Sequence, residues 1–194
     1  LLSLGPLTVA SIDTARSALV DRLDHAANHD FLTGLLSRGA FMKCGSELIS
    51  RLSGEKGRLT IMGLDVDHFK QINDTHGHAA GDRVLVEVAK IIRGNLRGDD
   101  LIARLGGEEF GLILPGVAPA DALGLAQRIR IAIEQTAVGE SETGSIHTTI
   151  SIGVVHHTLE EPVSLDRLLR DADKAMYAAK AAGRNRVVVH QPPS

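Results

Sequence analysis

The sequence predicts an α/β (α+β) fold in which helices cover a mixed central sheet of about five strands. Its 194 residues, 43% of them hydrophobic, are enough for one domain with a buried core and a short appendage. Apolar runs typical of strands alternate with segments in which apolar residues recur at helical spacing. One neighbouring pair of strands is joined by a Gly-Gly turn and is expected to form a hairpin, so the sheet should be mixed rather than wholly parallel.

The first half of the chain begins with a predicted linker helix at Ser11–Asn28, where apolar residues recur at heptad spacing. Because so short a repeat does not establish a coiled coil, pairing of this helix in a dimer stays a hypothesis. After a turn at Thr33-Gly34, a second amphipathic helix is expected at Arg38–Arg51. Leu59–Asp67 has the apolar composition of a buried strand and becomes acidic as it ends.

The second half alternates in the same way, starting with a helix expected at Val84–Leu96. The hairpin follows, with strands at Leu101–Leu105 and Glu108–Leu114 on either side of Gly106-Gly107, because glycine supplies the positive φ values of a tight turn. The remaining elements, in chain order, are a helix at Pro119–Gln135, a loop at Val138–Ser145, a strand at Ile146–Val155, a helix at Ser164–Ala182 and a strand at Val187–Val189.

Composition excludes several classes of protein. A formal net charge of -3 argues against a protein that grips a nucleic-acid backbone, and one Tyr, four Phe and no Trp leave few side chains for stacking on bases. The single cysteine, Cys44, excludes a disulfide scaffold and favours a cytoplasmic location. No apolar run approaches the ~20 residues of a spanning helix, so we expect no membrane contact from this stretch.

The sequence begins with Leu1 rather than Met, so we expect an output module cut from a longer protein. In that interpretation residues 1–28 are a linker helix, residues 29–190 form the domain, and residues 191–194 are a tail. A sensory domain would lie upstream, and the parent protein could be anchored in a membrane.

Two acidic clusters indicate a metal site. Asp65 and Asp67 lie two positions apart at a strand end and point to one face, whereas strand alternation after the turn would send Glu108 and Glu109 to opposite faces. Mg²⁺ takes one or two carboxylates together with water and substrate phosphates, as in phosphoryl transfer. Each carboxylate alone is more simply a solvated turn residue, but their joint placement at apolar strand ends favours metal.

Four motifs, in order, carry a family resemblance. They are His29–Leu35 at the entry, Asp65–Asp82 after the first strand, the hairpin Arg104–Phe110, and Ala172–Arg186 near the end. The hairpin, with Gly106-Gly107-Glu108-Glu109-Phe110, is similar to the naming motif of the GGDEF family of diguanylate cyclases in its GGEEF form. The resemblance covers roughly residues 29–190 and implies a palm-like nucleotidyl cyclase fold.

The resemblance also implies how the catalytic centre is built. The metal, Mg²⁺ with Mn²⁺ as a substitute, would be held by Asp65, the carbonyl of Val66 and Glu108. Glu108 or Glu109 would accept the proton of the attacking ribose hydroxyl, and which of them does so stays open. Asp67 is expected to support the site rather than to bind the metal.

The nucleotide itself would be bound by further residues that match the family pattern. Asn73 and Asp82 resemble the residues that recognise guanine, with His78 in the same stretch. Lys70, Lys180 and Arg184 resemble the cations that hold the triphosphate, the last two being expected one helical turn apart on one helix face. Gly106 and Gly107 would let the backbone approach the nucleotide. Phe69 lies in the nucleotide-binding stretch, but for Phe69 and Tyr177 we favour core packing over base stacking.

A regulatory site is implied as well. Arg97-Gly98-Asp99-Asp100 is similar to the RxxD motif by which family members bind their product, and Arg128 stands where a second product-binding arginine occurs. The simpler alternative is that Arg97 and Asp100 form a charge pair at a helix end.

The function that the resemblance implies is condensation of two GTP into cyclic di-GMP and two pyrophosphates. Because each domain would hold one GTP, a homodimer is required, and cyclic di-GMP would be both product and inhibitor. Two alternatives stay open at this point. One is a non-catalytic receptor for GTP or cyclic di-GMP, and the other is a different palm-like cyclase or polymerase, against which the lack of a basic, aromatic groove argues.

Overall fold

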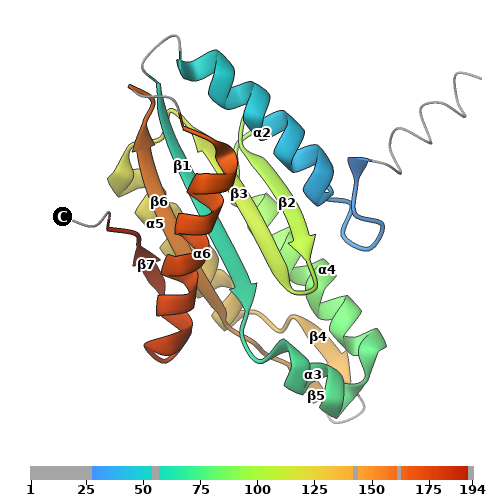
Figure 1. Cartoon of the computed structure of the whole chain (residues 1–194). Coiled ribbons are helices and arrows are strands. Elements are labelled where there is room, and N and C mark those ends of the chain that lie inside the picture. Colours follow the sequence, from blue (N-terminus) through green and yellow to red (C-terminus); the bar gives the residue numbers. More distant parts are fainter. Residues whose placement is uncertain (1–27, 54–56, 142–143, 161–162, 192–194) are drawn as a thin grey trace, which may run out of the picture.

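A mixed five-stranded sheet forms the centre of the computed structural model, which describes residues 28–53, 57–141, 144–160 and 163–191 (Figure 1). Its strands lie in the order β2-β3-β1-β6-β7. Their bounds are β1 Arg58–Val66, β2 Leu101–Gly106, β3 Glu109–Pro115, β6 Ile150–Thr158 and β7 Val187–Val189. β1 pairs antiparallel with β3 and β6, and β7 pairs parallel with β6, so the predicted mixed sheet is confirmed. The predicted helix at Ser11–Asn28 lies almost wholly outside the described residues.

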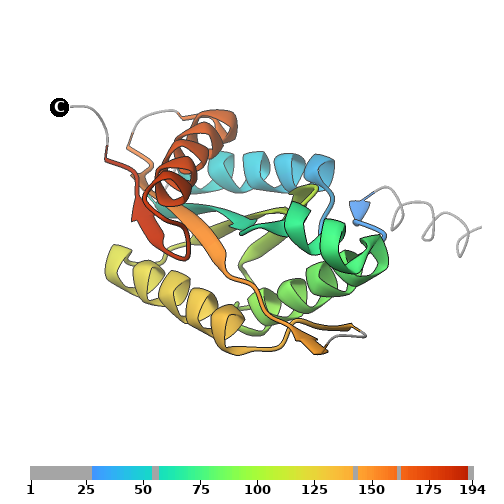
Figure 2. The same cartoon turned by 90° about the horizontal axis from the view of Figure 1, so that it is seen from below.

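Helices cover both faces of the sheet (Figure 2). The helices of the main domain are α2 Arg38–Ser53, α3 Phe69–His76, α4 His78–Gly94, α5 Pro119–Gln135 and α6 Leu165–Ala181. α2 and α6 pack on one face, α4 and α5 pack on the other, and α3 lies at the end of β1. The domain therefore has two hydrophobic cores, one on each side of the sheet.

Alternation along β1 divides its side chains between these cores. Leu59 and Ile61 belong to the core under α2 and α6, whereas Met62 and Leu64 belong to the core under α4 and α5. Asp65 continues the first set, so its carboxylate is directed to the α6 side of the sheet.

Gly153 of β6 sets the depth at which α6 packs. A Cβ at this position would collide with the backbone oxygen of Ala172 and the backbone nitrogen of Met176. Because glycine has no side chain, the helix lies directly on the strand. This close packing brings the C-terminal part of α6, with Lys180, over the end of β1.

Several expected boundaries were wrong. α4 starts at His78 rather than Val84, because Ala80 and Gly81 are already buried in its first turn. The eight-residue α3 was not predicted, since Phe69 and Ile72 are its two buried residues and give no clear periodicity.

The segment before β6 also differs from expectation. The predicted loop at Val138–Ser145 contains a small hairpin, β4 Gly139–Ser141 and β5 Gly144–Ile146. The predicted strand at Ile146–Val155 instead begins at Ile150 and runs to Thr158. Strands of three residues carry too few side chains for alternation to be visible in the sequence.

The β2–β3 hairpin turns one residue later than expected. Gly106 is still paired, with Glu109, and the register shifts between Arg104 and Gly106, so Leu105 forms a bulge. The turn is therefore Gly107-Glu108 rather than Gly106-Gly107. As a result Glu108 lies in the turn and not in a strand, and strand alternation does not decide where its side chain points.

Candidate active site at the end of the central strand

Asp65 is a buried carboxylate at the end of β1, with 4% of the residue exposed. Burial raises its pKa to about 6, against the opposing effect of Lys180, whose Nζ lies 2.7 Å from Asp65 Oδ2; the charges of Glu108 and Glu109 raise the pKa further. The positive charge of Lys180 does not offset the burial of Asp65, so this carboxylate loses its proton at a higher pH than an exposed aspartate does. It is therefore suited to receive a further cation.

The hairpin turn brings the second acidic cluster to the same place. Glu109 is the register partner of Asp65 in the β1–β3 pair, and the backbone N–H of Val66 donates to the carbonyl of Glu108 at 3.3 Å. Asp65, Val66 and Glu108, predicted as a metal-binding set, are thus neighbours. Within the described ranges, no three His, Cys, Asp or Glu side chains come together as a metal cluster. Asp65 and Glu108 would offer two carboxylates and Val66 a backbone carbonyl, and such oxygen donors suit a hard cation that also binds phosphate.

Asp67 is fully occupied by donors from its own chain. Its Oδ1 accepts from Ser151 Oγ at 2.7 Å, and its Oδ2 accepts from Thr149 Oγ1 at 2.6 Å and from the backbone N–H of Asn185 at 3.0 Å. These bonds tie the end of β1 to β6 and to the segment after α6. Asp67 is therefore a structural anchor rather than a free ligand.

Of the three predicted phosphate-binding cations, Lys180 is the one that contacts the acidic corner. Lys180 is on α6 and pairs with Asp65, while Lys70 is exposed in the first turn of α3. Arg184 does not continue the helix face, because α6 ends at Ala181 and Gly183 has a φ of 112°. Arg184 lies in the following turn with a φ of 62°, in the loop that Asp67 holds through Asn185. The expectation of one shared helix face was wrong.

The predicted guanine-binding residues lie on the α3–α4 pair. Asn73 belongs to α3, and His78 and Asp82 belong to the first two turns of α4. Gly81 lets the helices meet closely, because a Cβ there would collide with Asn73 Oδ1. Asp82 is exposed and lines a cavity of about 390 Å³ between α4 and β4.

The two aromatic side chains singled out from the sequence behave differently. Phe69 is 8% exposed and belongs to the core under α4, so core packing is confirmed for it. Tyr177 is 73% exposed on α6, so the expectation of core packing was wrong. The buried face of α6 passes through Ala175, Met176 and Ala179, which leaves Tyr177 on the outer side of the helix.

A second, separate pocket lies between the end of α4 and α5. It has a volume of about 300 Å³, and Arg97, Asp100 and Arg128 all line it. The Asp100 carboxylate accepts a hydrogen bond from the backbone N–H of Arg97 at 2.8 Å. The three residues predicted for product binding are therefore brought together, away from Asp65.

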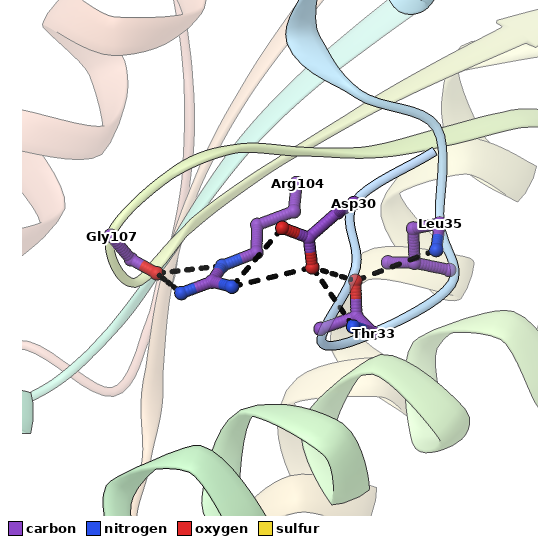
Figure 3. Close-up of polar contacts among 5 residues, drawn as sticks. All are labelled: Asp30, Thr33, Leu35, Arg104 and Gly107. Atoms are coloured by element: carbon purple, nitrogen blue, oxygen red, sulfur yellow. Dashed lines mark hydrogen bonds and ion pairs between the residues drawn. The ribbon is translucent and has the colours of Figure 1, made fainter. Parts of the chain in front are cut away.

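Sequence reasoning missed the residue that holds the hairpin turn in place (Figure 3). Arg104 of β2 donates through Nε and Nη2 to the carbonyl of Gly107, at 2.9 and 2.7 Å, and through Nη1 to both carboxylate oxygens of Asp30. Asp30 Oδ1 also accepts from the N–H and the hydroxyl of Thr33. Burial acts against ionisation of Asp30, but the bonds from Thr33 and the charge of Arg104 hold its pKa below the usual value.

This clamp joins the entry turn to the hairpin that carries Glu108. The Asp-x-x-Thr spacing of residues 30–33 is typical of a turn in which an aspartate bonds to the backbone, and it was the available sequence signal. The arginine partner is distant in sequence, so only the fold reveals the connection.

The fold and the acidic sheet end together define a domain of the palm-like nucleotidyl cyclase class. The sequence matches the family described as "Diguanylate cyclase, GGDEF domain" over residues 27–186, so the chain belongs to this family.

Individual relatives agree with the family. The chain is 39% identical over 175 residues to diguanylate cyclase DgcM of Escherichia coli, an alignment that covers 90% of this chain and 41% of DgcM. It is 44% identical over 163 residues to diguanylate cyclase TpbB of Pseudomonas aeruginosa, an alignment that covers 84% of this chain and 37% of TpbB. It therefore spans about two fifths of the length of these relatives. The coiled coil and GGDEF domain of DgcB from Caulobacter crescentus, solved in complex with c-di-GMP, has a TM-score of 0.86 at 30% identity, covering 94% of this chain and 95% of that one.

In the part of the chain that the structure describes, no helix is long and apolar enough to cross a membrane.

Proposed function

We propose that this domain is a diguanylate cyclase that condenses two GTP into cyclic di-GMP and two pyrophosphates. The observation that carries the proposal is the buried, poorly compensated carboxylate of Asp65 beside Glu108 and Glu109. Membership of the GGDEF family and the names of the relatives support it.

A divalent metal, in our proposal Mg²⁺ with Mn²⁺ able to replace it, would be held by Asp65, Glu108 and the carbonyl of Val66. The residues fit such an ion, because Asp65 is buried with one compensating cation and the site offers only oxygen donors. A bound ion of this kind supplies Lewis-acid stabilisation of the charge on phosphate oxygens.

The chain's own cations would bind the triphosphate. Lys180 Nζ lies 2.7 Å from Asp65 Oδ2, so a phosphate bound next to Asp65 would lie close to this ammonium group. Lys70, in the first turn of α3, and Arg184, in the turn after α6, would bind further phosphate oxygens. Charge-assisted hydrogen bonds from such groups orient the α-phosphate for attack.

Guanine would be recognised between α3 and α4. The Asp82 carboxylate can accept from the N1–H and the exocyclic amine of guanine, which adenine does not offer together, and the Asn73 amide can bond to the remaining polar edge. His78 lies one turn before Asp82 on the same helix. Gly106 and Gly107 allow the hairpin backbone to approach the nucleotide.

In the chemical step, the 3′-oxygen of one GTP forms a bond to the α-phosphorus of the other. The bond from that phosphorus to the bridging oxygen of pyrophosphate breaks, and the proton of the hydroxyl passes to the carboxylate of Glu108 or Glu109. Two such steps close the ring, so two domains, each with one GTP, must face one another.

Product feedback is the regulatory part of the proposal. The guanidinium groups of Arg97 and Arg128 and the carboxylate of Asp100 line one pocket, and this combination suits a guanine edge and a phosphodiester. We propose that cyclic di-GMP binds there and lowers turnover.

The test is incubation with GTP and Mg²⁺ over a range of protein concentrations, with the product identified by mass spectrometry. We expect cyclic di-GMP, a rate per protein that rises with concentration, and loss of turnover in Glu108→Ala but not in Arg93→Ala, a variant of an exposed α4 residue. Absence of cyclic di-GMP at every concentration would sink the proposal. Binding of cyclic di-GMP in calorimetry without any turnover would instead favour a receptor.

A further inference from the structure

A groove runs between α2 and α6 next to the acidic corner. It has a volume of about 340 Å³, and Gly63 and Leu64 of β1 form part of its floor. Glu109, the register partner of Asp65, lines the same groove. The groove therefore lies next to the proposed catalytic site, between α2 and α6, on the sheet face opposite to the one that α4 covers.

Charged side chains of both signs line this groove without pairing. Besides Glu109 they are Arg38 of α2 and Asp166, Arg170 and Asp173 of α6, and all five are exposed. None of them forms an ion pair or a side-chain hydrogen bond with any residue that the structure describes. Elsewhere on α6, the exposed Lys174 does pair with the half-buried Asp171.

Tyr177 extends the groove towards Lys180. Asp166, Arg170, Asp173 and Tyr177 follow one another at spacings of four, three and four residues, so they form one stripe along α6. The next residue in this stripe is Lys180, which pairs with Asp65. An exposed tyrosine at the edge of a polar groove is the kind of side chain that anchors protein interfaces.

We propose that the groove of Arg38, Glu109, Asp166, Arg170 and Asp173, together with the neighbouring Tyr177 on α6, is the surface on which a second copy of this domain docks to form the reacting dimer. The inference rests on the proposed function, since two GTP-bearing domains must face each other at Asp65. The groove adjoins Asp65 through Glu109, its register partner, and Tyr177 precedes Lys180, its ion-pair partner, on α6.

The charge pattern favours a copy of the same chain over other partners. In a two-fold interface each surface meets itself, so a patch that carries both signs can pair its acids with the bases of the other copy. A nucleic acid or an acidic peptide would need a surface of one sign, and this groove has three acidic and two basic side chains.

Two single charge reversals and their combination provide the test. Arg170→Glu leaves four acidic side chains and one basic side chain in the groove, so the groove should repel its own copy and the rate of cyclic di-GMP formation should fall at least tenfold at low protein concentration. Asp173→Arg leaves two acidic and three basic side chains and removes an acid with which the other copy could pair, so it should also lower the rate. An equimolar mixture of the two variants should be faster than either one alone. The double variant Arg170→Asp/Asp173→Arg, which keeps both signs, should recover most of the activity.

Controls separate docking from folding and from catalysis. Arg93→Glu and Glu160→Lys reverse exposed charges outside the groove and should leave the rate within twofold of wild type. The affinity of each groove variant for cyclic di-GMP at the Arg97 pocket, measured by calorimetry, should stay unchanged and reports correct folding. Tyr177→Ala should shift the concentration that gives half-maximal rate upward, with the KM for GTP at saturating protein unaltered.

Unchanged rates in the single reversals, or a mixture no faster than the average of its components, would overturn the docking surface. A wild-type domain that makes no cyclic di-GMP would instead show that the proposed function itself is wrong. If a reversal variant loses cyclic di-GMP binding, its rate is set aside and the double variant decides: recovery supports the surface and no recovery refutes it.

Discussion

Asp65 and Asp67 lie two positions apart on one strand end, and their surroundings differ completely. Asp67 accepts from a serine hydroxyl, a threonine hydroxyl and a backbone N–H, and so holds β6 and the loop after α6 against β1. Asp65 is equally buried but has Lys180 as its partner, with Glu108 and Glu109 acting against its charge. The comparison teaches that one carboxylate is held by hydrogen bonds from its own chain, whereas burial raises the pKa of the other although it pairs with Lys180.

The largest expected effect is on catalysis, at Asp65. Asp65→Asn removes a proposed metal ligand and keeps the size of the side chain, so cyclic di-GMP formation should fall on the order of 10³-fold. Turnover of GTP at saturating Mg²⁺ is the measurement. Glu160→Gln, an exposed acid far from the site, is the control and should stay active. Activity close to wild type in Asp65→Asn would remove Asp65 from the metal site.

The next effect is on stability, at Asp67. Asp67→Ala leaves the hydroxyls of Ser151 and Thr149 and the N–H of Asn185 without their acceptor, which should lower the free energy of unfolding by roughly 3 kcal/mol. Urea denaturation followed by circular dichroism measures it. Asp67→Asn keeps one acceptor oxygen and should cost less than the alanine variant. If Asp67→Ala unfolds at the wild-type urea concentration, the anchoring role is wrong.

A third effect concerns pH and metal affinity. Because burial raises the pKa of Asp65 to about 6, a proton competes with the metal below that pH. The affinity for Mg²⁺ should be nearly constant above about pH 7 and should fall about tenfold per pH unit below about pH 6. Calorimetric titration of the nucleotide-free domain measures this dependence. An affinity that stays level down to about pH 4.5 would mean that Asp65 is ionised throughout, as an ordinary surface carboxylate is.

The smallest effect is on the stability of Asp65→Asn. It distinguishes Asp65 from Asp67 most sharply, because removing the charge of Asp65 should raise the free energy of unfolding, whereas removing Asp67 should lower it. Between the unfolded pKa of 3.8 and the folded pKa of about 6, folded Asp65 binds a proton that the unfolded chain has lost, so its contribution to stability falls as pH rises through this window. Above about pH 6 Asp65 is ionised in both the folded and the unfolded chain, and the full cost of burying its charge lowers the free energy of unfolding. Since the pKa of about 6 already includes the effect of Lys180, Asp65→Asn should stabilise the metal-free domain at neutral pH, by ~1 kcal/mol after reduction for solvent screening, and by nothing near pH 4.

Unfolding experiments at both pH values check this sign. A loss of stability at neutral pH in Asp65→Asn would show that the ion pair with Lys180 outweighs the cost of burying the charge. Asp65 would then resemble Asp67, and the difference between the two positions would disappear.

The fold class and the acidic corner could be predicted because they depend on long patterns. The apolar run of Leu59–Asp67 and the glycine hairpin determine a mixed sheet whose centre ends in carboxylates. The short elements α3, β4 and β5 could not be found from their own periodicity, since α3 and β4 pack against α4 and β5 pairs with β4.

The different roles of individual side chains were harder to predict from the sequence. Asp65 and Asp67 look alike in the sequence, and the donors that distinguish them come from Lys180, Ser151 and Asn185, more than eighty residues away. Tyr177 was misplaced because one step around a helix changes burial completely, and the sequence does not specify which side of α6 meets the sheet to that accuracy.

The missing side chain at Gly153 has a consequence for the spacing of charges. A lysine side chain has a fixed length, so the distance between the α6 backbone and the sheet decides whether Nζ of Lys180 meets Asp65 or solvent. That distance is set where Ala172 and Met176 rest on Gly153, several residues from the carboxylate. Gly153→Ala would push α6 away from the sheet, because its Cβ would collide with the backbone of Ala172 and Met176. The distance from Lys180 to Asp65 would then increase, and the electrostatic environment of Asp65 would change although no residue at the sheet's edge had been altered.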